Sequence, residues 1–448
     1  MTAIVSVWLQ ASRCKTVGAA ALAFAAALAL SGCNEKGGDP GAQIGASPRL
    51  PEPQQFLLPT MHIARASSWK EGEKPSVAAG LRIDSIGIGL VHPRSLYALP
   101  NGDVLVVESS GPPAPINRPK DLVMGWVQSF AGARTQAPNR IVLLRDTDGD
   151  GTYKMRAVFI DKLHSPFGVA LIGNDLYVAN TDALVRYRYA EGATRIDEPG
   201  TMLTELPGGP IDHHWTKTLL ASPDGSKLYV GVGSNSNIAE NGLEAEKERA
   251  AIWEVDRATG AHRIFASGIR NPTGLDWEPQ NETLWAIANE RDELGPDLVP
   301  DYLTSVQNGG FYGWPYSYYG QHLDPRVEPQ RLDLVKTALV PDYALSSHVA
   351  PLGLAFYTAH DLPAQYQGGA FVAEHGSWNR DPLNGYKVVF IPFRNGTPSG
   401  SAQDVITGFL DADNHARGRP VGLAVDRSGA LLIADDLGNI VWRVSATK

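Results

Sequence analysis

A short segment of the chain gathers side chains of the kind that move protons: Asp212-His213-His214-Trp215-Thr216-Lys217. The imidazole of histidine has a pKa of about 6.5, so at neutral pH it can take a proton from an alcohol. Successive residues of a strand point to opposite faces, so at most one of the two histidines enters a given site. The segment therefore predicts a general base at His213 or His214, and a histidine that only packs in its loop is the alternative.

Two other segments carry arginines in a similar setting. Arg270 is followed by Asn271 and a proline, and a single glycine separates Arg417 from Arg419. Alternation along an extended chain puts Arg417 and Arg419 on one face, where two guanidinium groups can hold carboxylates or phosphates. Each arginine taken singly could instead belong to a structural salt bridge.

An acidic motif, Asp146-Thr-Asp148-Gly-Asp150-Gly151, has the spacing that begins a calcium-binding loop. In such a loop alternate carboxylates converge on one hard cation. The twelfth position is Ala157 rather than glutamate, so the motif is not an EF-hand. It predicts a metal site at Asp146, Asp148 and Asp150, with a tight acidic β-turn as the alternative.

The chain that must position these residues repeats one pattern six times. An apolar strand is followed by a polar turn and then by a second strand rich in valine, leucine and alanine. The units begin at His92, Ser165, His214, Arg270, Ala350 and Arg419. Strand pairs that recur about every 65 residues indicate a repeat architecture, for which the four-stranded blade is the natural module. The sequence predicts an all-β protein, a six-bladed β-propeller; a pair of β-sandwiches is the alternative.

The candidate histidines and arginines precede the first strand of their units. In a propeller the loops at one end of the central channel come together and build the site. We therefore expect His214, Arg270, Arg417 and Arg419 to converge at one mouth of the channel, although they are far apart along the chain.

The N-terminal residues have the features of an export signal. An unbroken apolar run, Val17–Leu30, is too short to span a bilayer and is preceded by two basic residues. The run ends in Leu30-Ser-Gly-Cys33, which resembles a bacterial lipobox. We expect residues 1–32 to be removed as a lipoprotein signal peptide and Cys33 to carry a lipid; a buried helix with an accidental cysteine is the alternative.

The rest of the chain divides into two parts. Residues 33–50 are rich in glycine, proline and polar residues and predict a flexible tether, and residues 51–448 predict the propeller domain. Asn34 follows the expected lipid site where an aspartate would be the usual signal for inner-membrane retention. We therefore expect a lipoprotein anchored in the periplasm, on the outer membrane.

Composition excludes several classes of function. The net charge of −9, without a basic stripe, argues against a nucleic-acid partner. Two cysteines among 448 residues exclude a disulfide scaffold and any zinc or iron–sulfur site built from several cysteines. The sequence has no C-x-x-C-H motif for a covalent haem, so this chain carries no c-type haem of its own.

Four motifs together resemble those of the soluble quinoprotein sugar dehydrogenases, most closely the sorbosone-dehydrogenase-like branch. They are His214-Trp-Thr-Lys-Thr-Leu219, Arg270-Asn-Pro-Thr-Gly274, Gly309-Gly-Phe-Tyr-Gly-Trp-Pro315 and Arg417-Gly-Arg-Pro-Val421. The resemblance covers nearly all of the chain after residue 50 and implies a six-bladed propeller that binds pyrroloquinoline quinone (PQQ) with Ca²⁺.

The resemblance also implies roles for individual residues. His214 is the general base, and His213 lies beside it among the cofactor-binding residues. The cofactor carboxylates and quinone oxygens contact Arg270, Asn271, Arg417 and Arg419, with Arg270 also acting in catalysis. PQQ is a tricarboxylate, which agrees with several arginines at one channel mouth of an acidic protein.

Some positions depart from the family pattern. Thr273 stands at a cofactor position where glucose-type members have glutamine. The lysine of the fifth blade has no direct counterpart, so Arg380 or His375 is expected to replace it. The family's calcium is held mainly by backbone carbonyls, which the alignment places at Asp292 and Glu293.

The resemblance implies an oxidoreductase that oxidises a sugar, polyol or sugar aldehyde with PQQ as the hydride acceptor. A separate electron acceptor, a cytochrome or a quinone, must then reoxidise the cofactor. Two alternatives remain: a non-catalytic propeller that binds carbohydrate or protein, and a calcium-dependent lactonase-like hydrolase. The lactonase would need carboxylates and asparagine at the channel rather than arginines.

Overall fold

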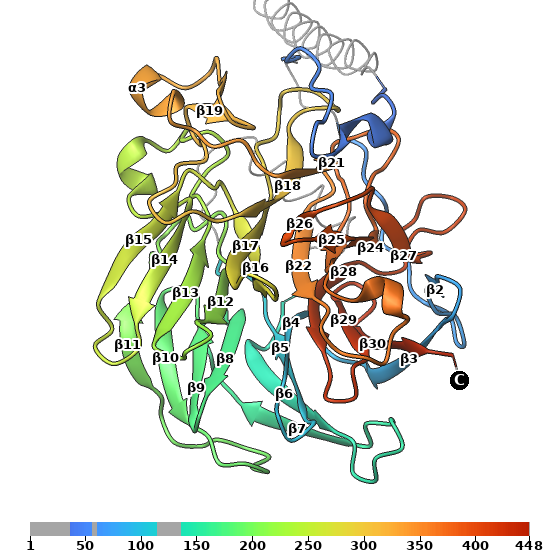
Figure 1. Ribbon diagram of the computed structural model, residues 1–448. Helices are drawn as coiled ribbons and strands as arrows, with labels where there is room; N and C mark the ends of the chain where they lie inside the picture. The colour runs from blue at the N-terminus through green and yellow to red at the C-terminus, as the bar shows by residue number, and fades with distance from the viewer. Residues whose placement is uncertain (1–35, 56–60, 114–135, 448) are drawn as a thin grey trace, which may run out of the picture.

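Six antiparallel sheets are arranged around a central channel (Figure 1). The computed structural model describes residues 36–55, 61–113 and 136–447. Blade 1 contains β4 (Pro93–Ala98), β5 (Val104–Glu108), β6 (Arg140–Arg145) and β7 (Met155–Ile160). Blade 2 contains β8 (Gly168–Ile172), β9 (Asp175–Ala179), β10 (Ala183–Arg188) and β11 (Thr201–Glu205). Blade 3 contains β12 (Lys217–Ala221), β13 (Lys227–Val232), β14 (Ala251–Asp256) and β15 (His262–Ser267).

The second half of the ring follows the same plan. Blade 4 contains β16 (Pro272–Glu278), β17 (Thr283–Ala288), β18 (Pro300–Ser305) and β21 (Tyr343–Ser347). Blade 5 contains β22 (Pro351–Phe356), β23 (Ala370–Glu374), β24 (Lys387–Ile391) and β27 (Gln403–Thr407). Blade 6 contains β28 (Pro420–Val425), β29 (Leu431–Asp435), β30 (Ile440–Ala446) and, as its outer strand, β3 (Leu81–Ile88).

Shorter elements decorate the blades. Two two-residue strands extend blades, β1 (Ile44–Gly45) beside β21 and β2 (Ser76–Val77) beside β27. Two small hairpins are β19 (Ser317–Tyr318) with β20 (His322–Leu323), and β25 (Phe393–Arg394) with β26 (Thr397–Pro398). The helical turns are η1 (Pro40–Gln43), η2 (Leu243–Glu246), α3 (Leu332–Val335) and η3 (Ala364–Tyr366).

The ring closes by pairing the two ends of the propeller. The inner strands contact one another in the order β4, β8, β12, β16, β22 and β28, and β28 returns to β4. In blade 6 the early strand β3 pairs antiparallel with the last strand, β30, over most of its length. The predicted six-bladed β-propeller is confirmed, and the six sequence units mark the inner strands of its blades.

The core lies between the blades rather than inside any one of them. Each blade is covered on both faces by its neighbours, so a central strand such as β5 is buried at every position. One apolar cluster joins β6 and β7 of blade 1 to β9 of blade 2, and another joins blades 2 and 3. Burial on both faces explains why the strands appear in the sequence as continuous apolar runs rather than alternating ones.

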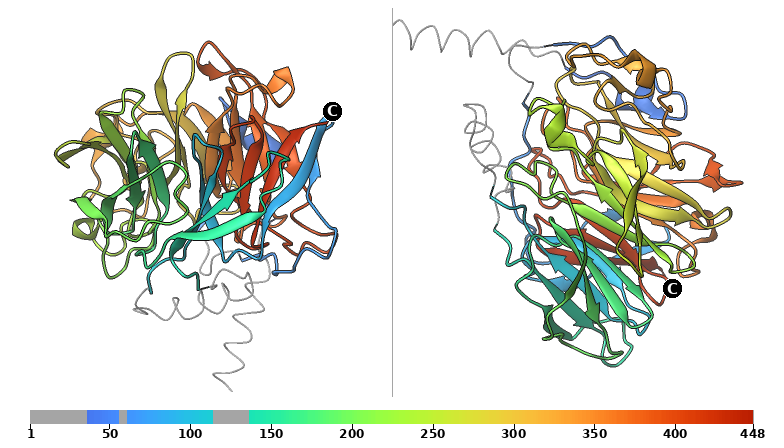
Figure 2. Two further views of the ribbon diagram at one scale, coloured as in Figure 1. Left: turned by 90° about the horizontal axis from the view of Figure 1, so that it is seen from below. Right: turned by 90° about the vertical axis from the view of Figure 1, so that its left-hand side faces the viewer.

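The N-terminal segment differs from the prediction. Residues 36–50, expected to belong to a flexible tether, are docked on blades 4 and 5 (Figure 2). Gln43 is buried and donates from Nε2 to the carbonyl of Asp297 at 2.6 Å, and β1 pairs with β21. The expectation of a tether is therefore wrong for these residues, because specific hydrogen bonds outweigh a composition typical of linkers. The predicted signal peptide and Cys33 lie outside the described residues.

Among the described residues, no helix is both long and apolar enough to cross a membrane.

Candidate active site

The candidate residues gather at the end of the channel where the inner strands begin, which we call the mouth. Antiparallel pairing places the start of each inner strand opposite the end of the second strand, as in Pro272 with Ala288 and Pro420 with Asp435. The loops that precede the inner strands and those that follow the second strands therefore surround one opening. This register brings together residues from all six blades.

His214 is positioned as a proton acceptor. Its Nδ1 lies 3.0 Å from the carbonyl oxygen of Ser234 and 2.9 Å from the Ser234 hydroxyl, which itself donates to the carbonyl of Ser236. Both neighbours of Nδ1 are acceptors, so in the neutral ring the proton resides on Nδ1. Within the described part of the chain no group bonds Nε2, which is therefore the free basic nitrogen.

The electrostatics of the site keep His214 neutral. Burial and then the positive charge of Arg270 lower the pKa of His214 well below its usual value. His213 is exposed and packs edge-on against the His214 ring, with ring centres 4.6 Å apart. Only His214 thus has a half-buried ring oriented by hydrogen bonds, as alternation along the chain predicted.

A buried ionic cluster stabilises the loop that carries His214. Asp212 accepts hydrogen bonds from Thr181 and, at 2.9 Å, from Arg249, and Lys217 lies 3.6 Å from the same carboxylate. Lys217 also donates to the carbonyl of Trp215. Burial lowers the pKa of Lys217 to about 8, and the Asp212 charge partly offsets that effect. The cluster fixes both ends of the segment that carries His214.

Arg270 organises the neighbouring loop. Its guanidinium donates to the carbonyl of Glu290 at 2.7 Å and to Oδ1 of Asn237 at 3.0 Å, and it lies 3.5 Å from the carboxylate of Asp292. These contacts use much of its donor capacity. Asn271, by contrast, has a buried Oδ1 without a hydrogen-bond partner in the described residues. Arg270 therefore supplies mainly charge and rigidity, and Asn271 offers a free polar atom.

Asp292 is held as an anion in the same loop. His348 at 3.3 Å, Asn379 at 2.9 Å and Arg270 surround its carboxylate. Burial alone would raise the pKa of Asp292, but the hydrogen bond from His348 and the charge of Arg270 lower it to about 2. The carboxylate is thus already neutralised by the protein's own donors.

The backbone of this loop bears on the predicted calcium ligands. The carbonyl of Asp292 accepts a hydrogen bond from Asn237 at 3.1 Å. The carbonyl of Glu293 accepts none from the described residues, and the Glu293 carboxylate pairs with Arg326 at 2.8 Å. Of the two predicted ligands, the Glu293 carbonyl is therefore the one left available for a cation.

Arg417 and Arg419 rest on different aromatic rings. Arg419 is buried and lies over Tyr386 at 5.6 Å, with its Nε unpartnered among the described residues. Arg417 is half-buried over Trp69 at 5.9 Å. Both side chains belong to the loop that enters β28.

A second polar cluster lies at the mouth, and the sequence predicted only one of its members, His375. Asp436 accepts a hydrogen bond from Arg94 and lies 3.0 Å from Nε2 of His375 and 3.7 Å from Nε2 of His92. Burial would raise the pKa of Asp436, but the charges of His375 and Arg94 lower it strongly. In the sequence, only position in the repeat unit could have indicated His92 and Arg94. These two residues flank the proline at the start of the first unit. The candidates His214, Arg270 and Arg419 lie at the start of other units.

Two predicted cofactor residues have other partners. Arg380 is fully buried and donates to the carbonyls of Pro382 and Gly38 and to the carboxylate of Asp297. Its guanidinium thus fixes the N-terminal segment, and His375 is the fifth-blade residue that joins the cluster at the mouth. Thr273 lies at the start of β16 and donates to the carbonyl of Pro351 at 2.6 Å, which links blades 4 and 5.

The acidic motif folds as a turn with an internal counter-charge. The carboxylates of Asp146, Asp148 and Asp150 come together as predicted. However, Lys154 donates to both Asp148 and Asp150, and Asp146 accepts the backbone N–H groups of Gly149 and Gly151 at 2.8 Å. An ammonium group therefore already balances the charge that a cation would have to neutralise.

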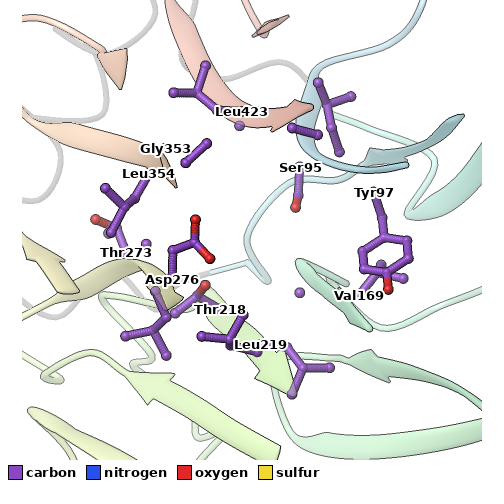
Figure 3. Close-up of a pocket in the computed structure, with 18 of the residues that line it drawn as sticks. Ser95, Tyr97, Val169, Thr218, Leu219, Thr273, Asp276, Gly353, Leu354 and Leu423 are labelled. Carbon is purple, nitrogen blue, oxygen red and sulfur yellow. The ribbon is translucent and has the colours of Figure 1, made fainter. Parts of the chain in front are cut away.

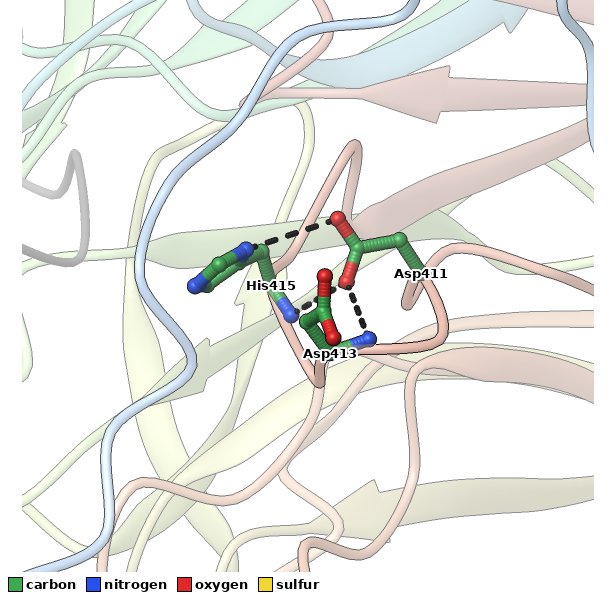
Figure 4. Close-up of side chains that lie close together, drawn as sticks. All are labelled: Asp411, Asp413 and His415. Carbon is green, nitrogen blue, oxygen red and sulfur yellow. Dashed lines mark hydrogen bonds and ion pairs between the residues drawn. The ribbon is translucent and has the colours of Figure 1, made fainter.

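A further group of possible metal ligands lies in the loop before β28 (Figure 4). Ligand atoms of Asp411, Asp413 and His415 lie within 4.8 Å of one another. One Asp411 oxygen accepts the backbone N–H groups of Asp413 and His415 at 2.9 and 2.8 Å. These bonds account for the geometry as a tight turn.

Below the mouth, the central channel contains a cavity of about 340 Å³ lined by the inner strands of all six blades (Figure 3). Its polar side chains are Ser95, Tyr97, Thr218, Thr273 and Asp276. Asp276 accepts the backbone N–H groups of Trp277 and Phe356, which ties blade 4 to blade 5, and burial raises its pKa to about 6. No basic side chain lines this cavity, so an anion would bind at the mouth and not in the channel.

The donors at the mouth suit a planar anion. Buried nitrogen donors of Arg94 and Arg419 and the amide oxygen of Asn271 have no hydrogen-bond partner among the described residues. Buried polar groups without partners are costly unless a ligand satisfies them. The two arginines can therefore hold an anionic ligand at the mouth that also carries His214, and the Asn271 oxygen can accept from an N–H or O–H group.

Two family models match the chain. One, described as Glucose / Sorbosone dehydrogenase, matches residues 174–377, and one described as TrAA12-like matches residues 335–447. The pyrroloquinoline quinone-dependent sugar dehydrogenase of Hypocrea jecorina is 23% identical over 81% of this chain and 87% of its own length. The pyrroloquinoline quinone-dependent pyranose dehydrogenase of Coprinopsis cinerea is 44% identical over 71% of this chain. The matched region covers 44% of the length of that protein.

Solved structures share the fold. The holo form of the PQQ domain of the Coprinopsis cinerea pyranose dehydrogenase superposes with a TM-score of 0.67 over 86% of this chain and 100% of that domain, at 19% identity. A calcium structure of the Trichoderma reesei family AA12 enzyme gives 0.68 over 87% and 99%, at 20% identity. At 19% and 20% identity, these two structures show that the fold is shared.

Proposed function

The chain belongs to the family of soluble PQQ-dependent sugar dehydrogenases, and we propose that it oxidises a sugar, polyol or sugar aldehyde with PQQ as the hydride acceptor. The observation that carries the proposal is the mouth itself. His214 presents a free Nε2 at the same mouth where buried nitrogens of Arg94 and Arg419 lack partners. A base next to an anion cradle is what a dehydrogenase with an anionic quinone needs.

The residues at the mouth fit the cofactor. PQQ carries three carboxylates, which Arg94 and Arg419 would hold, with Arg270 supplying further positive charge. The amide oxygen of Asn271 would accept a hydrogen bond from an N–H or O–H group of the bound molecule. Arginine is suited to this task because its planar donors match carboxylate geometry. When bound, PQQ supplies a quinone that accepts the hydride from the substrate.

His214 would remove the substrate's hydroxyl proton. Its neutral ring accepts the proton at Nε2, while Nδ1–H stays bonded to the Ser234 carbonyl, which keeps the ring in position. The Ser234 bond also favours the protonated ring once the proton has arrived, since a carbonyl can accept from imidazolium. Arg270 opposes this charge, so the imidazolium would release its proton readily.

A calcium ion would bind at the loop after β17. The Glu293 carbonyl is a suitable hard ligand for that ion, which would supply Lewis-acid chemistry. The neighbouring Asp292 carboxylate is engaged by His348, Asn379 and Arg270 and would act by holding the loop in shape. The acidic turn at Asp146, Asp148 and Asp150 is less suited because Lys154 occupies it.

Reconstitution tests the proposal directly. Purified protein given PQQ and Ca²⁺ should retain quinone absorbance after gel filtration and should oxidise sugars with a soluble dye as acceptor. His214→Ala should keep the absorbance and lose about 10²- to 10⁴-fold in kcat, the usual contribution of a general base. His360→Ala, an exposed histidine, is the matched control and should behave as wild type.

Absence of retained quinone, together with unchanged activity in His214→Ala, would refute the proposal. A protein that binds sugar but has no turnover would favour the non-catalytic alternative. Lactone hydrolysis with Ca²⁺ alone would favour the hydrolase.

We also propose that Cys33 carries a lipid anchor that holds the protein on the periplasmic side of the outer membrane, where a membrane-borne cytochrome or quinone reoxidises the cofactor. The lipobox resemblance of Leu30-Ser-Gly-Cys33 supports the anchor. Cell fractionation tests it: Cys33→Ala should move the protein from the membrane to the soluble fraction.

A further inference from the structure

The segment that follows the proposed lipid site crosses the mouth of the propeller. Residues 36–55 and 61–69, which we call the strap, contact loops of blades 4, 5 and 6. The backbone of Gly37 donates to the carbonyl of Asp381 at 2.7 Å, and that of Gln54 donates to Leu294 at 3.0 Å. Later in the strap, the backbone of His62 donates to Trp378 at 2.9 Å.

These contacts converge on the loop proposed to hold calcium. Asp297 in that loop accepts the backbone N–H of Gly38 at 2.6 Å and a hydrogen bond from Arg380 at 2.9 Å, and its carbonyl accepts from Gln43. The buried guanidinium of Arg380 also donates to the carbonyl of Gly38. The start of the strap is therefore fixed rigidly beside the mouth.

The covalent chain limits how far the lipid can be from this point. Cys33 is four residues before Gly37. A fully extended chain spans at most about 3.6 Å per residue, so the anchor can be no more than about 14 Å from Gly37. A propeller tied so closely cannot turn its mouth freely away from the membrane.

The same end of the molecule presents apolar side chains to solvent. Leu243 in η2, Leu323 in β20 and Leu332 at the start of α3 are exposed. The insertion that carries β20 and α3 is attached to the calcium loop by Arg291 with Asp324 and by Arg326 with Glu293. Figures 1 and 2 show that α3, in orange, and the first part of the strap, in blue, lie on the same side of the molecule.

Exposed charges of both signs surround these apolar residues. Lys247 and Lys336 follow η2 and α3, and Glu244, Glu248 and Asp333 are exposed beside them. Exposed leucines can enter the interface of a bilayer, and the lysines can contact its phosphates. The covalent anchor and this surface thus favour the same orientation.

We propose that the rim of the mouth over blades 3 to 5, formed by the strap, η2 and the β19–α3 insertion, lies against the phospholipid bilayer. The proposal rests on lipidation of Cys33 and deepens the proposed function by assigning the face on which the acceptor arrives. Electrons would then leave the mouth toward a carrier within or on the membrane, while sugar enters from the open side of the rim.

Site-specific labelling tests the orientation. The predicted mature chain has Cys33 as its one cysteine, and that residue would be acylated. A fluorophore on Leu323→Cys or Leu332→Cys would therefore be unique. The lipidated holoenzyme would be placed on phosphatidylethanolamine–phosphatidylglycerol vesicles that contain a brominated lipid as quencher. Met202→Cys is the matched control, because Met202 is an exposed apolar residue in the outer strand of blade 2, away from the rim.

We expect loss of fluorescence at positions 323 and 332 and none at 202. A long glycine–serine insertion between Cys33 and Glu35 should weaken quenching at the rim while dye-coupled turnover stays unchanged. Equal quenching at all three positions would overturn the proposal. Protein that stays in solution would show that the anchor, rather than the orientation, had failed, and dye-coupled turnover tests the dehydrogenase separately.

Discussion

At the scale of single residues, His214 illustrates how a backbone carbonyl can choose a tautomer. The Ser234 carbonyl cannot donate a proton, so it fixes the imidazole proton on Nδ1 and leaves Nε2 free. Burial and Arg270 then keep the ring neutral by lowering its pKa. The base is thus prepared before any substrate arrives.

This arrangement predicts the acid limb of the pH profile. The neutral imidazole is the active form, and its pKa lies below the ordinary value, so kcat/KM should hold constant down to about pH 6.5 and fall only below it. Steady-state assays with a dye acceptor at constant ionic strength would measure this. A decline centred above pH 6.5 would show that another group, or a raised pKa, controls the reaction.

The cluster around Asp436 gives a second prediction at this scale. Asp436→Asn leaves the buried guanidinium of Arg94 without its counter-ion, which should cost about 3–5 kcal/mol of unfolding free energy. Asp404→Asn removes the partner of Lys387 from an exposed pair and should cost no more than about 1 kcal/mol. Urea unfolding of both variants would compare them, and similar losses would contradict the argument.

The Asp436 cluster also explains what the sequence could not reveal. Arg94 and Asp436 are 342 residues apart and belong to blades 1 and 6, which meet only when the ring closes. A spacing argument identifies residues within one unit, such as His214 and Lys217, but does not pair units at the two ends of a closed ring.

At the scale of elements, the backbone directly after β13 lies so close to the site that Gly233 has no room for a side chain. A Cβ on Gly233 would collide with Oδ1 of Asn271 and with Cβ of His214. Gly233→Ala should therefore lower both PQQ retention and turnover, because it displaces a cofactor contact and the base together. Gly209→Ala is the control, since a Cβ at that position would have no atom within 4 Å and the change should be silent.

The acidic turn between β6 and β7 offers a comparison of two aspartates. Asp146 accepts backbone N–H groups, whereas Asp148 is exposed and pairs with Lys154. Asp146→Ala should therefore cost about 1 kcal/mol of stability, and Asp148→Ala should cost less than about 0.5 kcal/mol. Thermal melts with and without Ca²⁺ would check this, and a Ca²⁺-induced rise in Tm that Asp148→Ala abolishes would instead establish a metal site.

The second strands of the blades were predictable because nearly every position is buried, and the inner strands because prolines and glycines punctuate them. The outer strands were not, because sequences such as Thr201–Glu205 and Gln403–Thr407 are short, polar and half-exposed. Their strand conformation comes from pairing with an existing blade edge rather than from their own composition.

At the scale of the whole molecule, the strap shows where composition misled. Its glycines and prolines are typical of a linker, yet Gln43 and Asp297 bind it to the propeller through long-range contacts. Such contacts become visible only once the ring has brought residues near 40 and near 297 together. The same docking makes the anchor a constraint on orientation and not only on location.

Buried carboxyl groups make the stability of the whole propeller depend on pH. Burial raises the pKa of Glu374 to about 8, and its Oε2 has no hydrogen-bond partner in the described residues. Burial likewise raises the pKa of Asp435 to about 6. The lowered pKa of Asp292 does not matter here, because that group is ionised in both states above about pH 5.

The direction of the effect follows from proton linkage. A carboxyl whose pKa is raised in the folded state contributes its full stability at low pH, where it is protonated in both states. As pH rises, the carboxyl ionises first in the unfolded chain, and the free energy of unfolding falls. Tm should therefore fall as pH rises from about 5 to 8. Glu374→Gln should lessen this fall and raise Tm most at pH 8, as calorimetry at both pH values would show. An equal change in Tm at pH 5 and pH 8 would mean that Glu374 is ionised in the folded protein and that its burial has another explanation.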